Sequence, residues 1–228
     1  MIKFYFNASP NPSKVALFLE EAGIAYDPIP VDTRKGEQFA PALVALNPNA
    51  KVPVIVDGDT VVFDSNAILL YLAETSGRFL PPEGARNRGN LLSWLMFVAT
   101  GVGPFSGQAV HFRHFAPEKV PYGIERYTYE AKRHFGILDA HLATHRYMVA
   151  DTYTIADMDV WGWSRMIPFI LGEDAFQGLP NLKRLTDEIS ARPAAARALA
   201  LKDRFPFKAE MDAESRKHMF KHLSPSAA

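Results

Sequence analysis

Residues 2–32, "IKFYFNASPNPSKVALFLEEAGIAYDPIPVD", decide the fold class of this chain. Ile2 to Phe6 are β-branched, charged or aromatic residues in a strand-like run, and the turn that follows is rich in Asn, Ser and Pro. Apolar residues then recur at helical spacing as far as Gly23, and "AYDPIPVD" predicts a second strand. A strand, a crossover helix and a strand at this short spacing predict a parallel pair of strands.

The residues after this unit extend the same sheet. "GEQFAPALVALNP" predicts a short helix, "VPVIVDGDTVVFD" a hairpin around Asp57-Gly58, and "SNAILLYLAETSG" a third helix that ends at Gly77. We therefore expect an α/β domain over residues 1–79. "GRFLPPEGARN" breaks the periodicity and predicts a linker.

From Arg88 onward the sequence predicts helices and no convincing strand. Gly, Pro and Asp separate four stretches of helical periodicity: "GNLLSWLMFVAT", "YGIERYTYEAKRHFGILDAHLATH", "TIADMDVWGWSRMIPFIL" and "PNLKRLTDEISARPAAARALAL". We expect an all-helical domain over residues 87–201. The tail, residues 202–228, is charged and carries no motif, so we expect it to be partly ordered.

The composition argues against several classes of protein. The 228 residues include 25 basic and 25 acidic side chains, so no surplus charge favours nucleic acid or an anionic membrane as a partner. The sequence shows no signal-peptide pattern and no apolar run of the roughly 20 residues that a membrane span requires. We expect a cytoplasmic protein that acts on small molecules or proteins.

The chain contains no cysteine. A redox protein of this strand–turn–helix layout would show Cys-x-x-Cys at the first turn, where this sequence has "NASPNPSKV". Any thiol chemistry must therefore use a thiol that a ligand brings in. The histidine pairs His111 and His114, or His141 and His145, show no third ligand, so we expect no metal site.

Several stretches carry a resemblance to the cytosolic glutathione transferases over residues 1 to about 201: "SPNPSKV", "NPNAKVPVIVDGD", "FDSNAILLYLAE" and "YTIADMDVWGW". "GEQF", "GVGPFSGQAVHF" and "PYGIERY" resemble the bacterial Nu class, whose members include glutathione-dependent disulfide reductases. The resemblance implies a thioredoxin-like N-terminal domain, a helical C-terminal domain, a homodimer, glutathione as co-substrate and a role in detoxification. Ser9 and Asp64 stand where the family usually has Thr and Glu.

The resemblance assigns the activation of glutathione to Asn11, assisted by Ser9. The thiolate is the reactive form of a thiol, and an ordinary thiol is ionised to only roughly 1% to a few per cent near neutral pH. A helix N-terminus with hydroxyl or amide donors nearby favours that anion. The alternative is that Asn11 is a helix N-cap before Pro12 at the first helical position, and that Ser9 is an ordinary turn residue.

The resemblance also implies contacts of the ligand with Val52 and a cis Pro53. In that geometry the N–H and C=O of Val52 would pair with the cysteinyl part of glutathione like a neighbouring strand. A trans proline at the start of an edge strand is the commoner alternative. Gln38 and Lys51 are implied near the glycine end and the middle of the tripeptide, and each is otherwise an ordinary exposed polar residue.

The γ-glutamyl end of glutathione is implied at the start of the third helix. Ser65 would hold its carboxylate and Asp64 its ammonium, although either residue is also a candidate N-cap. Arg126 is implied at a glutathione carboxylate, within its own subunit or across a dimer interface. The alternative for Arg126 is an ion pair with Glu130, four residues further along a helix.

Two further motifs are interpreted as structural. "TIAD", residues 154–157, has the Thr-x-x-Asp pattern of a capping box, in which Thr154 caps a helix and Asp157 reaches back. "GVGPFSG" resembles a phosphate loop only superficially, because it contains Pro104 and lacks the required Gly-Lys-Ser/Thr.

The sequence therefore favours a glutathione transferase whose bound thiolate attacks a disulfide or an electrophilic carbon, in a pocket walled by the helical domain. Without a protein cysteine, glutathione would serve as both nucleophile and resolving thiol. The alternative is a non-catalytic glutathione-binding or regulatory protein on the same fold. Turnover with glutathione and a small disulfide distinguishes the two.

Overall fold

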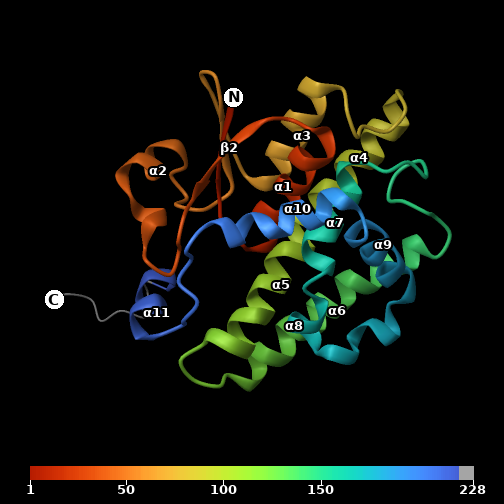
Figure 1. Ribbon diagram of the computed structural model, residues 1–228. Coiled ribbons are helices and arrows are strands. Elements are labelled where there is room, and N and C mark those ends of the chain that lie inside the picture. The colour runs from red at the N-terminus through yellow and green to blue at the C-terminus, as the bar shows by residue number, and fades with distance from the viewer. Residues whose placement is uncertain (221–228) are drawn as a thin grey trace. The chain divides into compact units, whose positions relative to one another are not determined.

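A computed structural model describes residues 1–220 of the chain (Figure 1). Residues 221–228, the end of the expected tail, lie outside the described residues. Contacts between residues divide the chain into two units. The first unit is Met1–Ile68 together with the chain from Arg197 onward, and the second is Leu69–Ala196.

The first unit is built on a four-stranded sheet. Its strands lie in the order β2-β1-β3-β4 and span Ile2–Phe6 (β1), Tyr26–Pro30 (β2), Val54–Asp57 (β3) and Thr60–Phe63 (β4). β1 and β2 are parallel, whereas β3 is antiparallel to both β1 and β4. Helix α1 (Pro10–Ala22) makes the crossover, and Gly58 adopts a left-handed φ of 58° in the hairpin turn. The predicted α/β architecture is confirmed.

Burial in β1 and α1 follows the sequence pattern. Ile2, Phe4 and Phe6 are buried on one face of β1, and the alternate residue Lys3 is exposed. In α1 every residue from Pro12 to Leu19 is buried. Burial on all sides is typical of a helix that lies inside a protein rather than on its surface. Lys14 is the one charged residue in this buried run.

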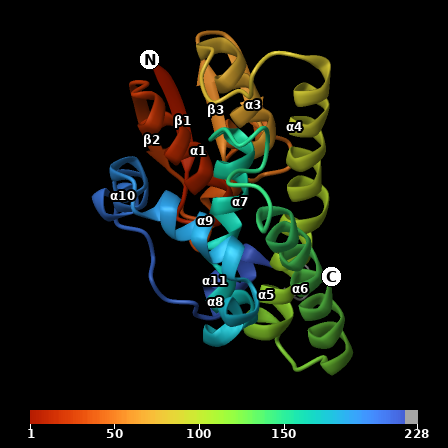
Figure 2. The same ribbon diagram turned by 90° about the vertical axis from the view of Figure 1, so that its right-hand side faces the viewer.

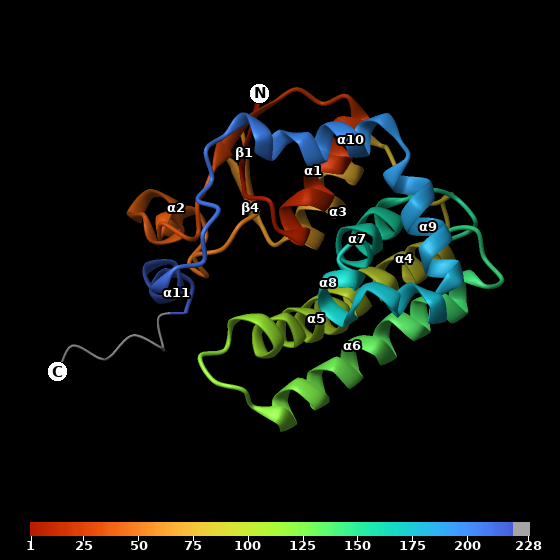
Figure 3. The same cartoon turned by 60° about the horizontal axis from the view of Figure 1, so that its bottom comes forward.

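The tail packs on the first unit up to the last described residues. After helix α10 (Pro193–Ala200) and a short 3-10 turn, the chain leads to helix α11 (Ala213–Met219), which lies beside α2 (Pro41–Leu46) in Figures 1 and 3. The rings of Phe205 and Phe207 contact Phe6, with ring centroids 5.5 and 5.8 Å away. The segment 205–219 is therefore held by specific contacts with the sheet and with the loop after β2.

Asp32 is the centre of the polar contacts between this loop and the tail. It is 5% exposed, and its carboxylate accepts hydrogen bonds from the backbone N–H groups of Lys208 at 2.7 Å and Arg34 at 3.0 Å. The Arg34 guanidinium in turn donates to the carbonyl oxygens of Lys208 and Ala209. The loop and the tail thus bind each other through both backbone and side-chain groups.

We expect Asp32→Ala to lower the free energy of unfolding by about 1–3 kcal/mol, because it leaves buried N–H donors without an acceptor. The loss should be accompanied by faster proteolysis and hydrogen exchange in residues 205–219. Thermal unfolding and limited proteolysis check this, with exposed Asp203→Ala as the control. Parental protease resistance of the tail in Asp32→Ala would contradict the assigned contacts.

The second unit is helical. Figure 2 shows its helices, which span Ala85–Phe97 (α4), Gly103–Val110 (α5), Pro121–Leu142 (α6), Ile155–Ser164 (α7), Ile167–Leu171 (α8) and Pro180–Ser190 (α9). Helix α3 (Ser65–Ser76) begins in the first unit and ends in the second at Gly77, which has a φ of 67°. In the described part of this unit, pairing of the β type is limited to a single bridge between Val149 and Thr152.

Two of the predicted helical stretches each form two helices. Residues 154–171 form α7 and α8, and residues 180–201 form α9 and α10. Pro193 begins α10, as expected because proline is tolerated in the first turn of a helix but not in its interior. "GVGPFSG" lies in a π-helical turn and in α5, so the interpretation that it is no phosphate loop is consistent with its helical structure.

The capping box at α7 is confirmed. Thr154 Oγ1 accepts a hydrogen bond from Ala156 N–H, and Asp157 Oδ2 accepts one from Thr154 N–H at 2.8 Å. The other carboxylate oxygen accepts from Met148 N–H at 2.8 Å, which fixes the preceding loop. Burial raises the pKa of Asp157 to about 7, while these hydrogen bonds oppose the rise.

We expect Asp157→Ala to lower the free energy of unfolding by about 2 kcal/mol, because a cap and a loop contact are lost together. Denaturant unfolding measures the loss. Asp187→Ala, which removes a surface ion pair with Lys183, is the control and should change stability by less than about 0.5 kcal/mol. Equal effects of the two substitutions would show that the buried network contributes no more than a surface pair.

Candidate glutathione site

The site begins with the turn between β1 and α1. Ser9 occupies the N-cap position of α1, with φ −78° and ψ 166°, but its side chain makes no capping hydrogen bond. The Ser9 hydroxyl instead donates to Asn7 Oδ1 at 2.6 Å. Asn11 is the second residue of the helix and is half-buried. The alternative that Asn11 is the N-cap is therefore wrong, because the helix already begins at Pro10.

The first turn of α1 has few backbone donors. Pro10 and Pro12 carry no N–H, and the N–H of Ser13 donates to the Ser9 carbonyl at 3.2 Å. Asn11 supplies the one backbone N–H among the first three helical residues and adds the two amide hydrogens of its side chain. An anion at this turn would meet these donors together with the partial positive charge of the helix N-terminus.

The Val52–Pro53 peptide bond is cis, as the family resemblance implies. The trans alternative is wrong. Pro53 is buried directly before β3, and Val52 is half-buried outside the strand. Lys51 is exposed, and its carbonyl oxygen accepts a hydrogen bond from Asn47 Nδ2 at 2.8 Å.

The start of α3 combines a cap with a buried hydroxyl. Asp64 has a left-handed φ of 72°, and its Oδ1 accepts hydrogen bonds from the N–H groups of Asn66 at 2.9 Å and Ala67 at 3.2 Å. Asp64 therefore caps α3, as one of the two alternatives predicted. Ser65 is the first helical residue and is 3% exposed, and its hydroxyl donates to Asn66 Oδ1 at 3.3 Å. A helix offers no internal acceptor for the N–H at this position.

Gln38 differs from the expectation of an ordinary exposed residue. It lies in a 3-10 turn, Glu37–Phe39, and is 5% exposed. Its Nε2 donates to the carbonyl oxygen of His218 in α11 at 3.1 Å, and its Oε1 is buried without a partner among the described residues. The tail therefore covers Gln38. The unpartnered Oε1 is an acceptor that a ligand N–H or a water molecule can satisfy.

Arg126 forms the ion pair that sequence spacing offered as the alternative. Its Nη1 lies 2.7 Å from Glu130 Oε1, and Arg133 contacts the other oxygen at 2.9 Å. Hydrogen bonds from Arg133 and then from Arg126 hold the pKa of Glu130 below its usual range. A contact of Arg126 with a glutathione carboxylate stays a prediction.

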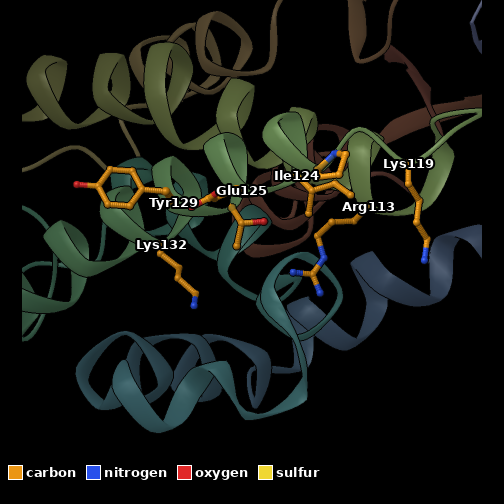
Figure 4. Close-up of a pocket in the computed structure, with 8 residues that line it drawn as sticks. Arg113, Lys119, Ile124, Glu125, Tyr129 and Lys132 are labelled. Atoms are coloured by element: carbon orange, nitrogen blue, oxygen red, sulfur yellow. The ribbon is translucent and has the colours of Figure 1, made fainter.

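A groove with a volume of about 520 Å³ runs along the first turns of α6 in the second unit. Figure 4 shows the side chains of Arg113 and Lys132 projecting on the same side of this helix as Glu125. The groove is lined by Arg113, Lys119, Pro121, Ile124, Glu125, Thr128, Tyr129 and Lys132. Among these residues Arg113, Lys119 and Lys132 are cationic, and Glu125 is the one acidic residue. The pocket for a second substrate, which the sequence places in the helical domain, stays a prediction.

Neither a metal cluster nor a membrane span is found in the described residues. No group of three or more His, Cys, Asp or Glu residues among residues 1–220 could hold a metal ion. The rings of His141 and His145 stack on each other at 4.3 Å, and His114 Nε2 lies 2.9 Å from the carbonyl oxygen of Phe169. None of the described helices has both the length and the apolar character that crossing a membrane requires.

The sequence matches known domains over most of both units. Residues 8–75 match the glutathione S-transferase N-terminal domain, and residues 124–193 match the glutathione S-transferase C-terminal domain. The Escherichia coli disulfide-bond oxidoreductase YfcG is 40% identical over 206 residues, which cover 87% of this chain and 94% of YfcG. This chain belongs to the glutathione S-transferase family. The E. coli disulfide-bond oxidoreductase YghU is 38% identical to this transferase over 214 residues, covering 86% of this chain and 73% of YghU.

Solved structures of glutathione transferases share the fold. A transferase from Burkholderia graminis, with two glutathione molecules bound per subunit, is 33% identical with a TM-score of 0.83, over 90% of this chain and 89% of that one. A transferase from Pseudomonas putida, with one glutathione disulfide per subunit, is 33% identical with a TM-score of 0.81, over 88% and 91% of the two chains. The thioredoxin-like and helical architecture is thus confirmed.

The candidate residues divide between the two matched domains. Those in the N-terminal match are Ser9, Asn11, Gln38, Lys51, Val52, Pro53, Asp64 and Ser65. Arg126 lies in the C-terminal match, and the tail lies beyond both. Sequence reasoning missed Lys14 and Asn66, which the structure joins to Ser65. A signal was present, because Lys14 is the one charged residue in the largely apolar run from Pro12 to Leu19.

Proposed function

We propose that this transferase binds glutathione on its first unit and uses the glutathione thiolate to reduce disulfides. The observation that carries the proposal is the first turn of α1. In a thioredoxin-like fold without cysteine, this turn presents Ser9 and Asn11 at a helix N-terminus, and the same unit contains the cis peptide bond before Pro53. Such a turn can stabilise a thiolate but has no thiolate of its own.

The residues of the first unit suggest how the tripeptide is held. The backbone of Val52 pairs with the cysteinyl part, while Gln38 and Lys51 contact the glycine end and the middle. Ser65 and the N-terminus of α3 hold the γ-glutamyl carboxylate. Asp64 binds the ammonium through Oδ2, since its Oδ1 already caps α3. Capping and ligand binding by Asp64 are therefore compatible.

The chemistry balances with two glutathione molecules. The first thiolate attacks one sulfur of the disulfide, so that a mixed disulfide forms and a thiolate leaves and takes up a proton. A second glutathione thiolate then attacks the glutathione sulfur of the mixed disulfide, which yields glutathione disulfide and releases the second thiol. The neighbouring structures with two glutathiones or one glutathione disulfide per subunit support this stoichiometry. An electrophilic carbon is a further target for the same thiolate.

The proposal includes a homodimer, a role for Arg126 and a cytoplasmic location. Dimers are expected from the family resemblance, and Arg126 would reach a glutathione carboxylate in its own subunit or in the partner. Sedimentation analysis tests the dimer, and the glutathione affinity of Arg126→Ala tests the residue. Fractionation of the host cells tests the location.

A regulatory protein is the second candidate, because the nitrogen regulation fragment of the yeast prion protein Ure2p is 32% identical to this transferase with a TM-score of 0.83, over 88% of this chain and 96% of that one. The Ure2 protein of Eremothecium gossypii is 32% identical over 236 residues, covering 86% of this chain and 66% of that protein. The deciding experiment measures glutathione-dependent reduction of a small disulfide by the purified protein. We expect catalytic turnover. Glutathione binding without turnover of disulfides or electrophilic carbons would favour the regulatory alternative.

A further inference from the structure

The tail engages Gln38, the residue assigned above to the glycine end of glutathione. The Gln38 side chain is 5% exposed, and its Nε2 donates to the carbonyl oxygen of His218 in α11 at 3.1 Å. Its Oε1 is buried and has no hydrogen-bond partner among residues 1–220. A side chain buried to this extent can contact a ligand only if the segment that covers it moves away. Glutathione and α11 therefore compete for Gln38.

The ring of His218 covers the same loop. Gly36 has a left-handed φ of 81°, and a Cβ added at this position would lie 2.6 Å from His218 Nδ1. A side chain at Gly36 would thus collide with the ring or displace it. Figure 3 shows α11 beside α2, the helix that follows this loop. Glycine at position 36 permits α11 to lie directly on the turn that carries Gln38.

The tail is anchored ahead of α11. The rings of Phe205 and Phe207 contact β1, and the N–H of Lys208 donates to the carboxylate of Asp32 at 2.7 Å. These contacts are made to the sheet and to the beginning of the loop after β2, not to Gln38. The anchor can therefore persist when α11 moves away from Gln38.

Helix α11 is held together by contacts within the tail. Asp212 Oδ1 accepts a hydrogen bond from the N–H of Ser215 at 2.8 Å, and the buried Ser215 hydroxyl donates to the carbonyl oxygen of Glu210 at 3.1 Å. Lys208 Nζ pairs with Asp212 at 2.8 Å, which ties the helix to the anchor. Because none of these contacts involves Gln38, α11 can leave Gln38 as an intact helix.

We propose that α11 is an autoinhibitory cover of the glycine end of the glutathione site, which glutathione displaces from Gln38 when it binds. The inference rests on the proposed function, since it takes Gln38 as a contact of the glycine end. A tethered segment competes at a high effective concentration, so a few contacts suffice to oppose a free ligand. Closure of the cover lowers the apparent affinity in proportion to the open fraction.

The test compares glutathione with γ-glutamylcysteine, which has the same thiol and γ-glutamyl group but no glycine. Hydrogen exchange of the α11 amides is followed in the full-length parent with each ligand at saturation. We expect glutathione to accelerate exchange in α11, because it displaces the helix from Gln38. γ-Glutamylcysteine should bind and leave this exchange unchanged.

A variant of the cover provides the second measurement. His218→Ala removes the ring from Gly36 and should loosen α11 in the absence of ligand. We expect the dissociation constant of glutathione, measured by calorimetry, to fall about threefold to tenfold, which corresponds to a cover closed in about two-thirds to nine-tenths of parent molecules. The affinity for γ-glutamylcysteine should stay at the parental value. Lys217→Ala, at the neighbouring exposed position, is the control and should change neither affinity.

The outcomes distinguish this inference from the proposed function. A parent protein that does not bind glutathione contradicts the proposed function. A parent that binds glutathione with unchanged or slower exchange in α11 overturns the cover alone, as does weaker glutathione binding in His218→Ala. If His218→Ala leaves α11 as protected as in the parent, Asp212→Ala, which removes the cap of the helix, replaces it. Parental glutathione affinity in a variant with a loosened α11 also overturns the cover.

Discussion

Asn11→Ala is expected to lower turnover at neutral pH by about tenfold to a thousandfold, the range for losing one donor to a stabilised anion. Pro10 and Pro12 have no N–H, so the Asn11 amide is the main side-chain source of donors in the first turn of α1. The Ser9 hydroxyl already donates to Asn7 at 2.6 Å, which leaves Ser9 an assisting role. Because Asn11 is not the N-cap, its replacement removes no cap from α1.

The pH dependence identifies the cause of that loss. Without the amide donors the thiolate is less stable, so the pKa of bound glutathione rises and less of it is ionised near neutral pH. Much of the lost rate should therefore return at high pH, and glutathione affinity should change far less than the rate.

The measurement is the thiolate absorbance of bound glutathione and the turnover rate, both followed against pH in the parent, Asn11→Ala and Ser9→Ala. If Ser9→Ala loses the parental thiolate titration and turnover rate while Asn11→Ala keeps them, the residue that stabilises the thiolate is Ser9. If neither variant changes them, this turn is not the active site.

The first unit could be predicted from the sequence because its signals are local. β1 alternates buried and exposed residues, and the short spacing of β1, α1 and β2 permits only a parallel crossover connection. The boundaries between successive helices of the second unit were harder to predict. Helical periodicity continues across residues 165–166, where the chain leaves α7 and enters α8, so the pattern alone predicted one helix.

The site was predictable only in part. The residues of the first turn and of the start of α3 follow helix-capping patterns, which are local. The cis bond before Pro53 entered through the family resemblance, since a trans bond is the commoner state of an X-Pro peptide. Gln38 donates a hydrogen bond to the carbonyl oxygen of His218, 180 positions away, and Lys14 donates one to Asn66, 52 positions away. Such contacts have no short-range signature in a single sequence.

Ser65→Ala is expected to weaken glutathione binding by about 1.5–3 kcal/mol, or about tenfold to 150-fold in the dissociation constant. Ser65 is buried at the first position of α3, where its N–H can donate to the γ-glutamyl carboxylate. Its hydroxyl, which donates to Asn66 Oδ1 at a long 3.3 Å, can turn and donate its hydrogen to the carboxylate instead. A hydrogen bond to a charged, partly buried group contributes more than one between neutral groups. The substitution acts at the carboxylate rather than at the sulfur, so turnover at saturating glutathione should remain close to that of the parent.

Calorimetric titration of the parent and Ser65→Ala with glutathione measures this effect. Ser76→Ala is the matched control, because Ser76 lies at the other end of the same helix and donates to the Leu72 carbonyl oxygen at 2.6 Å. It should leave the affinity unchanged. Ser65→Ala should raise the dissociation constant of glutathione, whereas Asn11→Ala should lower the turnover rate. This contrast would show that the γ-glutamyl carboxylate and the sulfur are bound at two distinct subsites. An unchanged dissociation constant in Ser65→Ala would contradict the assignment of the γ-glutamyl carboxylate to the start of α3.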